Sequence, residues 1–250
     1  RHRQDLDLSL QCLRDEFSTT TRKGEFVSLM TKYDVTLTGE SPLLMHADDL
    51  KWRSELDRWL ANPENKRLSK AGDDRTPAWK WLGYCYHDGV RLGMPADNLM
   101  TLLREGGARV PTGKKGATYK RQSQSGLIVD QMLWPLLTAD GKQVSWPALS
   151  ALIEEKDYAV HEATAEKLGF ELFAKAAKVG MSKHIRVRPR FNAWSVSGSI
   201  TVVDETITGE ILALILEMAG TYCGLGDWRP SSPSKPGPWG RFRATVKVQR

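Results

Sequence analysis

Apolar and polar residues alternate along several short stretches of the chain, which is typical of strands that bury one face. The clearest stretch is 32–39, where Tyr33, Val35 and Leu37 are separated by polar residues. The last stretch, 241–248, alternates in the same way. Further strands are expected at 127–133, 185–191 and 196–203.

Helical spacing of apolar residues separates these strands. Helices are expected at 46–62, 95–104 and 209–219. Residues 147–179 also show helical spacing, so we expect a helical insertion at about 140–180. Between the first two helices, the aromatic-rich stretch 78–92 contains Asp88-Gly89, a dipeptide typical of tight turns, and predicts a hairpin.

Without the insertions, the order of elements is strand, helix, strand, strand, helix, strand. This is the ferredoxin-like (RNA-recognition-like) βαββαβ plan, an α+β fold. We expect this core to span 31–250, with insertions at about 46–92 and 140–180. Residues 1–30 are expected to be an N-terminal appendage. Its apolar spacing predicts a short amphipathic helix through Leu6, Leu10, Leu13 and Phe17.

The composition indicates which class of binding partner to test. The chain has 250 residues, a net charge of +6 and nine tryptophans, so nucleic acid is the first partner to test. Cys12, Cys85 and Cys223 are too far apart for a CxxC zinc site or a disulfide framework. No apolar run approaches the roughly 18–20 residues of a membrane span. We therefore expect a globular, cytoplasmic protein with no metal, no cofactor and no membrane contact.

The most informative segment is 220–230, where a helix runs into a glycine-rich loop. Glycines let backbone N–H groups approach an anionic backbone, and Trp and Arg side chains stack on bases or pair with phosphates. The candidate nucleic-acid ligands of this loop and of the strand after it are Gly224, Gly226, Trp228, Arg229 and Arg241. The alternative is an ordinary helix C-cap followed by a long loop.

Two basic segments are further candidates. On a strand, Arg186, Arg188 and Arg190 share one face, and no acidic residue lies near them in the sequence. They either follow a phosphate backbone or form a solvated sheet face that pairs with carboxylates of a neighbouring strand. The long loop at 108–125 either folds onto phosphates or is simply solvated. Its candidate ligands are Arg109, Lys114, Lys115, Lys120 and Arg121.

Three segments of the chain are informative as a set. The first is Val35-Thr36-Leu37-Thr38-Gly39-Glu40-Ser41-Pro42-Leu43. The second is Leu92-Gly93-Met94-Pro95-Ala96-Asp97-Asn98-Leu99, leading to Leu102-Leu103-Arg104. The third runs from Gly224-Leu225-Gly226 to Gly240-Arg241-Phe242. They occur in the order seen in the RAMP superfamily of CRISPR-associated proteins, and the chain resembles in particular the backbone subunits that coat guide RNA.

The resemblance implies a non-enzymatic subunit of an antiviral, CRISPR-type effector ribonucleoprotein. Such a subunit binds single-stranded RNA, or DNA, and assembles with other copies of itself and with effector subunits. Two alternatives remain: a metal-independent endoribonuclease on the same fold, and a phage-type accessory protein that mimics such a subunit.

His46, Asp48 and Asp49 form the only cluster that suggests catalysis. The resemblance implies this too, because some RAMP backbone subunits cleave target RNA with an acidic residue after the first strand. His46 is a possible general base for RNA cleavage. The competing interpretation, which we prefer, is that the two aspartates cap the helix that begins there.

Overall fold

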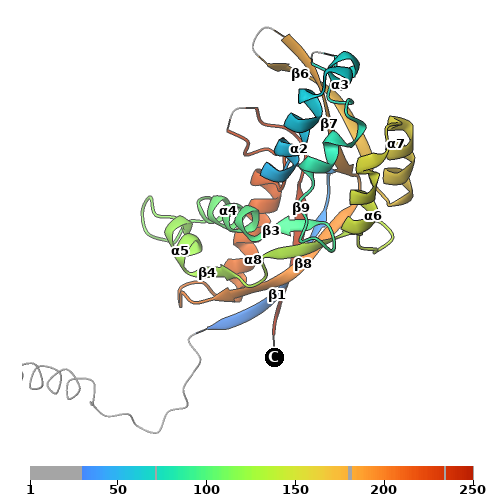
Figure 1. The fold of residues 1–250 in the computed structure, drawn as a ribbon. Helices are drawn as coiled ribbons and strands as arrows, with labels where there is room; N and C mark the ends of the chain where they lie inside the picture. The colour runs from blue at the N-terminus through green and yellow to red at the C-terminus, as the bar shows by residue number, and fades with distance from the viewer. Residues whose placement is uncertain (1–29, 71, 180–181, 234, 250) are drawn as a thin grey trace, which may run out of the picture.

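The computed structural model describes residues 30–70, 72–179, 182–233 and 235–249 (Figure 1). Except for Met30, the predicted N-terminal appendage at 1–30 lies outside the described residues. The described chain is a mixed α+β structure with two antiparallel sheets. Among the described residues, no helix is long and apolar enough to cross a membrane.

The larger sheet has the strand order β3-β5-β8-β1-β9, with β4 also paired to β8. Its pairs are all antiparallel, and β1 lies between β8 and β9 over most of its length. The strands are β1 (Thr31–Gly39), β3 (Gly93–Pro95), β4 (Leu127–Val129), β5 (Leu133–Thr138), β8 (Trp194–Val202) and β9 (Phe242–Val248).

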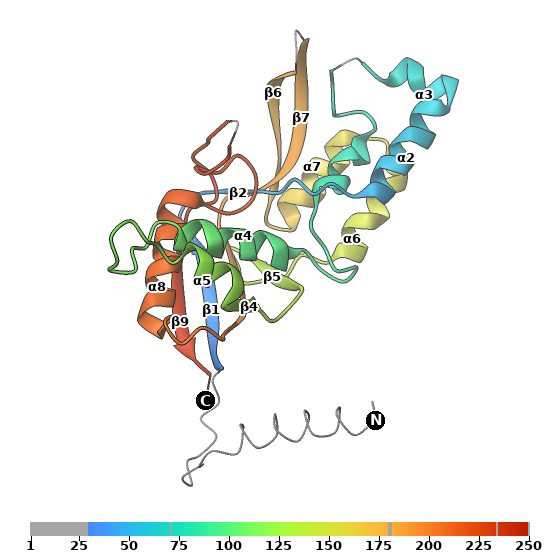
Figure 2. The same cartoon turned by 90° about the vertical axis from the view of Figure 1, so that its left-hand side faces the viewer.

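Helices α4 (Ala96–Gly107) and α8 (Gly209–Met218) cover one face of this sheet (Figure 2). Apolar residues on their inner sides share a core with Val35 and Leu37 of β1, both almost fully buried. The alternation predicted for 32–39 therefore marks the buried face correctly.

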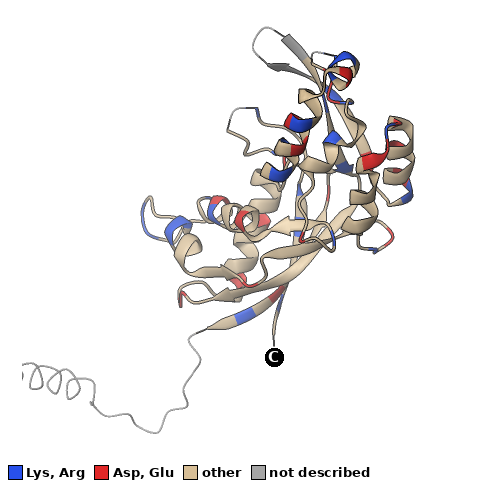
Figure 3. Cartoon of the chain, viewed as in Figure 1, with Lys and Arg blue, Asp and Glu red and all other residues tan. Residues whose placement is uncertain are grey.

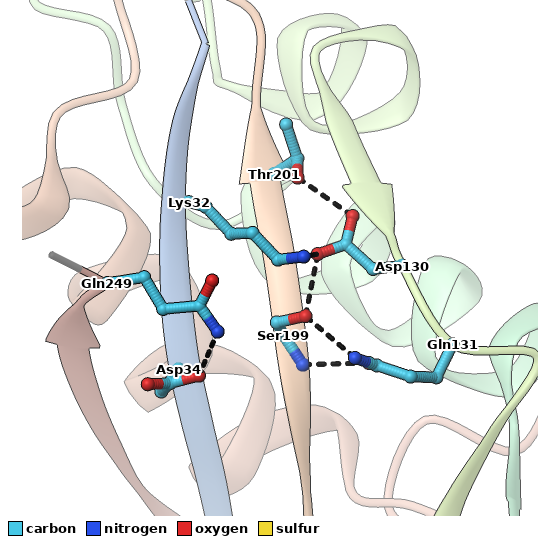
Figure 4. A network of polar contacts seen from close by, with 7 residues as sticks. All are labelled: Lys32, Asp34, Asp130, Gln131, Ser199, Thr201 and Gln249. Atoms are coloured by element: carbon cyan, nitrogen blue, oxygen red, sulfur yellow. Dashed lines mark hydrogen bonds and ion pairs between the residues drawn. The ribbon is translucent and has the colours of Figure 1, made fainter.

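The other face of the larger sheet is polar (Figure 4). Its side-chain contacts hold the link between the short strands β4 and β5 against β8. Between β4 and β5, the Asp130 carboxylate accepts hydrogen bonds from Ser199 Oγ (2.6 Å) and Thr201 Oγ1 (2.8 Å) and pairs with Lys32 (3.2 Å). Gln131 Oε1 accepts from the N–H of Ser199 at 2.8 Å, so this side chain replaces a missing strand partner.

The smaller sheet has the order β2-β7-β6 and carries a long hairpin that extends away from the larger sheet (Figure 2). Its strands are β2 (Leu43–Leu44), β6 (Glu171–Val179) and β7 (Ser182–Phe191). Short helices surround it: α2 (Leu50–Ala61), α3 (Pro63–Leu68), η1 (Ala78–Tyr84), α6 (Trp146–Ser150), η2 (Ala151–Glu154) and α7 (Tyr158–Lys167).

Three of the predicted elements are wrong: the hairpin at 78–92, the loop at 108–125 and the helical insertion at about 140–180. The expected hairpin at 78–92 is instead the 3₁₀ helix η1, in which Ala78 and Trp81, three residues apart, are both buried. Only an isolated bridge, His87 to Leu92, surrounds the predicted turn. The loop at 108–125 contains the short helix α5 (Lys120–Ser125).

The predicted helical insertion at 140–180 is helical only in its first part, through α6, η2 and α7. Residues 171–179 form β6, which pairs with β7 along its whole length. Ala and Lys favour helices locally, but the ladder with β7 overrides this preference.

The tryptophans serve mainly the core. Six of the nine are buried, namely Trp52, Trp79, Trp81, Trp134, Trp146 and Trp194. Two of them lie flat against glycines of neighbouring strands, Trp134 on Gly198 and Trp194 on Gly39. The high Trp content, which we took as a sign of nucleic-acid binding, therefore reflects packing at most positions.

Candidate nucleic-acid interface

The three segments that resemble the RAMP family meet in space. Backbone hydrogen bonds join the first to the third: Gly240 N–H donates to Pro42 O at 2.8 Å and Asp227 N–H to Leu44 O at 2.9 Å. Glu105 of α4, the residue directly after the second segment, forms an ion pair at 3.2 Å with Arg229 of the third.

A polar cavity of about 250 Å³, here the glycine-loop cavity, opens where these segments meet. The start of α4 contributes Asn98 and Thr101 to its wall, and the chain after β2 contributes His46. Tyr86 Oη donates a hydrogen bond to the carbonyl of His46 at 2.9 Å. The remaining wall is Leu102 and the loop residues Gly224, Leu225, Gly226, Asp227 and Arg229.

Three N–H groups of the glycine loop already have acceptors within the protein, which leaves fewer donors for the backbone cradle that we expected. The N–H of Gly224 donates to Ala219 O at 2.9 Å, and that of Leu225 to Gly240 O at 2.8 Å. As noted above, Asp227 N–H also bonds within the chain. The loop therefore contributes mainly its shape and its side chains to the cavity, and fewer free backbone N–H donors.

Packing explains the glycines instead. Gly226 has φ +79°, and a Cβ atom there would lie 2.5 Å from Leu44 O and 2.7 Å from Leu43 Cδ1. Gly224 has φ +73°, and a Cβ atom there would lie 2.8 Å from Pro230 Cδ and 2.9 Å from Trp239 O. Gly226 therefore lets the loop lie directly on β2, and Gly224 lets the loop pack closely on itself.

Arg229 and Trp228 are each held by contacts within the protein. Besides its pair with Glu105, the Arg229 guanidinium donates to Ser231 Oγ at 3.0 Å. Trp228 adopts φ 51°, which is rare for a bulky residue, and stacks on Trp239 at 6.0 Å between ring centroids. Lys175 Nζ lies 3.0 Å from the centre of the Trp228 ring.

The three arginines of β7 differ sharply from one another. Arg190 pairs with Glu171 on the neighbouring strand, and Arg188 pairs with Asp227 of the glycine loop. Of the two alternatives left open for this row, pairing with a carboxylate of a neighbouring strand is therefore found for Arg190, and Arg188 pairs with a carboxylate of a loop. Arg186 forms no ion pair with any described residue, and it lies directly opposite Lys175 in the β6–β7 ladder.

The predicted catalytic cluster is not assembled. Asp49 accepts a hydrogen bond from the N–H of Lys51 at 2.7 Å as the N-cap of α2, and Asp48 pairs with Arg53. The capping interpretation is thus confirmed for Asp49. His46 faces a different carboxylate, Asp227, with 3.6 Å between Nδ1 and Oδ2.

Asp227 joins the glycine loop to the rest of the site. Burial alone would raise the pKa of this carboxyl group, but neighbouring His46 and the charge of Arg188 lower it below its ordinary value. Asp227 is therefore ionised at neutral pH. Sequence reasoning missed its role because its partner Arg188 is 39 positions away.

The other predicted cations lie from the end of α4 to the start of α5, except Arg241, which directly precedes β9. Arg109 follows the end of α4, with its guanidinium 5.4 Å from the ring centre of Tyr222. Lys and Arg residues mark the segment around α5 (Figure 3). Lys114, Lys115, Lys120, Arg121 and Arg241 are all exposed.

Comparison of the sequence with protein-family models and with curated proteins finds no match. Within the described part of the chain, no group of three or more His, Cys, Asp or Glu side chains is arranged to hold a metal ion.

Proposed function

We propose that this protein binds single-stranded nucleic acid, RNA in preference to DNA, as a non-enzymatic subunit of a CRISPR-type effector ribonucleoprotein. The bound strand follows the basic face of the β6–β7 hairpin, passes the glycine-loop cavity and continues towards the cations around α5. A ferredoxin-like core is part of this proposal. The strand order β5-β8-β1-β9, with α4 and α8 on one face, supports it.

One observation carries the proposal: Lys175 and Arg186 lie opposite each other, and neither has a carboxylate partner among the residues that the structure describes. Like charges directly across two strands destabilise a sheet. A phosphate between them removes this repulsion. The Trp228 ring beneath Lys175 adds an aromatic surface next to the phosphate position.

The open face of the larger sheet is a poorer candidate. RNA-recognition domains stack bases on aromatic side chains of such a face. In the described parts of β8, β1 and β9, the open face carries hydroxyl and charged side chains, while Tyr33, Trp194 and Phe242 are buried on the other side. We therefore place the strand on the smaller sheet.

The test is a fluorescence anisotropy titration with a short single-stranded RNA, the matching DNA and a duplex. Binding should weaken steeply with salt, because phosphate contacts release counterions. The double variant Lys175→Glu, Arg186→Glu should lose affinity about tenfold or more. Lys167→Glu, an exposed lysine on α7, is the charge-matched control. No binding of the wild type at low salt would refute the proposal.

Two further readouts test the rest of the proposal. The RNA should stay intact on a denaturing gel after long incubation, since the protein is proposed to bind and not to cleave. On a long RNA, mass photometry should detect complexes with several copies of the protein. A strict one-to-one complex would argue against assembly.

A further inference from the structure

A second cavity, about 320 Å³ in volume, shares His46 as a wall residue with the glycine-loop cavity. We call it the α2–η1 pocket. It lies between the start of α2, the helix η1 and the strand β7. Its wall includes His46, Ala47, Trp52, Trp79, Tyr84 and Arg186.

Aromatic side chains form much of this wall. The rings of Trp52 and Trp79 are 5.6 Å apart between centroids, and both residues are more than nine-tenths buried. His46 and Tyr84 meet edge to face at 4.8 Å. The volume is at the lower end of the ~300–1,000 Å³ of small-molecule sites and suits one flat ring system.

The charges of the pocket largely cancel. Asp74 accepts from Lys80 Nζ at 2.6 Å and from Tyr84 Oη at 3.4 Å, while Asp48 pairs with Arg53. A lining of paired donors and acceptors favours a neutral group that both donates and accepts hydrogen bonds, and disfavours a free anion. Arg186 differs, because it also borders the pocket but has no carboxylate partner among the described residues.

We infer that the α2–η1 pocket takes one unstacked nucleobase of the bound strand, while Arg186 and Lys175 hold adjacent phosphates. A nucleobase is a flat, uncharged ring with hydrogen-bond donors and acceptors on its edge. It is covalently joined, through the sugar, to a phosphate that can pair with Arg186. Proteins that bind an extruded base combine stacking with hydrogen bonds to its edge. This inference rests on the proposed function and adds that the binding affinity depends on the presence of a base at one position.

The experiment is an abasic scan, in which one base at a time is removed from a short single-stranded RNA. Loss of the base in the pocket should weaken binding roughly fivefold to a hundredfold, the range of one base-stacking contact, while other positions change little. Replacing that base by each of the other three measures the selectivity of the pocket.

Ala47→Leu fills part of the pocket and should remove the abasic effect while retaining the salt dependence of binding. Ala61→Leu, at the exposed end of α2, is the matched control and should behave as wild type. If Ala47→Leu fails to fold, photocrosslinking of the wild type to 5-iodouridine at the sensitive position is the second measurement. Crosslinks to His46, Trp52, Trp79 or Tyr84 would support the inference, and crosslinks confined to 224–240 would overturn it.

The outcomes separate this inference from the proposed function. Salt-dependent binding with a flat abasic scan overturns the base pocket and leaves the proposed function standing. An absence of binding at low salt overturns both.

Discussion

The two sheets expose polar faces that differ in how their charges are compensated. On the larger sheet, Asp130 binds Lys32 and two hydroxyl groups, so its charge is compensated within the protein. On the smaller sheet, acids pair with Arg188 and Arg190, while Lys175 and Arg186 form no ion pair with any described residue, and Lys175 lies over the ring of Trp228. The ion pairs of a face, and not its number of cations, therefore decide how much of its charge is compensated within the protein.

The largest expected effect concerns the loop that covers β2 of the smaller sheet. Gly226→Val should destabilise the protein by about 2–5 kcal/mol, because it combines a left-handed backbone with an overpacked contact to Leu44. Gly116→Val is the control, since Gly116 has a similar φ of +73° and no atom within 4 Å of a Cβ. It should cost only about 1–2 kcal/mol. Denaturant unfolding measures both, and equal losses would contradict this account of the loop.

The second prediction separates paired from unpaired arginines on one strand. Arg188→Ala leaves Asp227 without its arginine partner and with only His46 beside it, and should cost about 1–3 kcal/mol of folding stability. Arg186→Ala should stay within about 0.5 kcal/mol of the wild type but weaken RNA binding several-fold. Unfolding curves and anisotropy on both variants measure the two effects. If Arg186→Ala destabilised the fold and left affinity unchanged, the contrast between the two arginines would be wrong.

The third prediction concerns the larger sheet. Asp130→Asn should cost about 1–2 kcal/mol at neutral pH, through weaker bonds to Ser199 and Lys32, with RNA affinity unchanged. Burial tends to raise the pKa of Asp130, but the hydrogen bonds of Ser199 and Thr201 and the nearby Lys32 lower it overall.

The pH dependence of this variant follows from that lowered pKa. The stabilisation by ionised Asp130 is complete above the unfolded pKa of about 3.9 and is lost as the pH falls through the lower folded pKa. Wild type and Asp130→Asn should therefore become more similar in stability in acid. A constant difference down to the acid transition would count against the ionic contribution.

The smallest expected effect is the pH dependence of folding stability that comes from His161 of α7. Trp81 Nε1 donates to His161 Nδ1 at 3.1 Å, so His161 is neutral and its Nε2–H donates to Glu155 O at 3.1 Å. Burial lowers the pKa of His161. Its contribution to stability is complete above the unfolded pKa of about 6.5 and declines as the pH falls through the folded pKa, by at most about 1.4 kcal/mol per pH unit.

Urea unfolding between neutral and mildly acidic pH measures this dependence. The variant His161→Phe should have a weaker pH dependence than the wild type. His87→Asn is a necessary companion, because burial also lowers the pKa of His87 and adds a contribution of the same sign. An unchanged slope in His161→Phe would show that His161 is not the group responsible.

The sequence by itself determined the elements whose buried face repeats locally. The strand at 32–39 and the helices at 95–104 and 209–219 occur close to their predicted bounds, because their core residues recur with the strand or helix period. The sequence also identified the three segments that meet at the glycine-loop cavity. It failed at 171–179, where composition favours a helix and only pairing with β7 makes a strand.

The tertiary structure alone decided which charged side chains form ion pairs with one another. Asp227 reaches Arg188 only because the loop lies on β2, and Lys175 lies opposite Arg186 only in the register of the β6–β7 hairpin. Ion pairing depends on distances of a few ångströms between residues remote in the chain, which local periodicity does not record. For the same reason, the sequence listed the cations as candidates but could not separate those that form ion pairs within the described chain from those that do not.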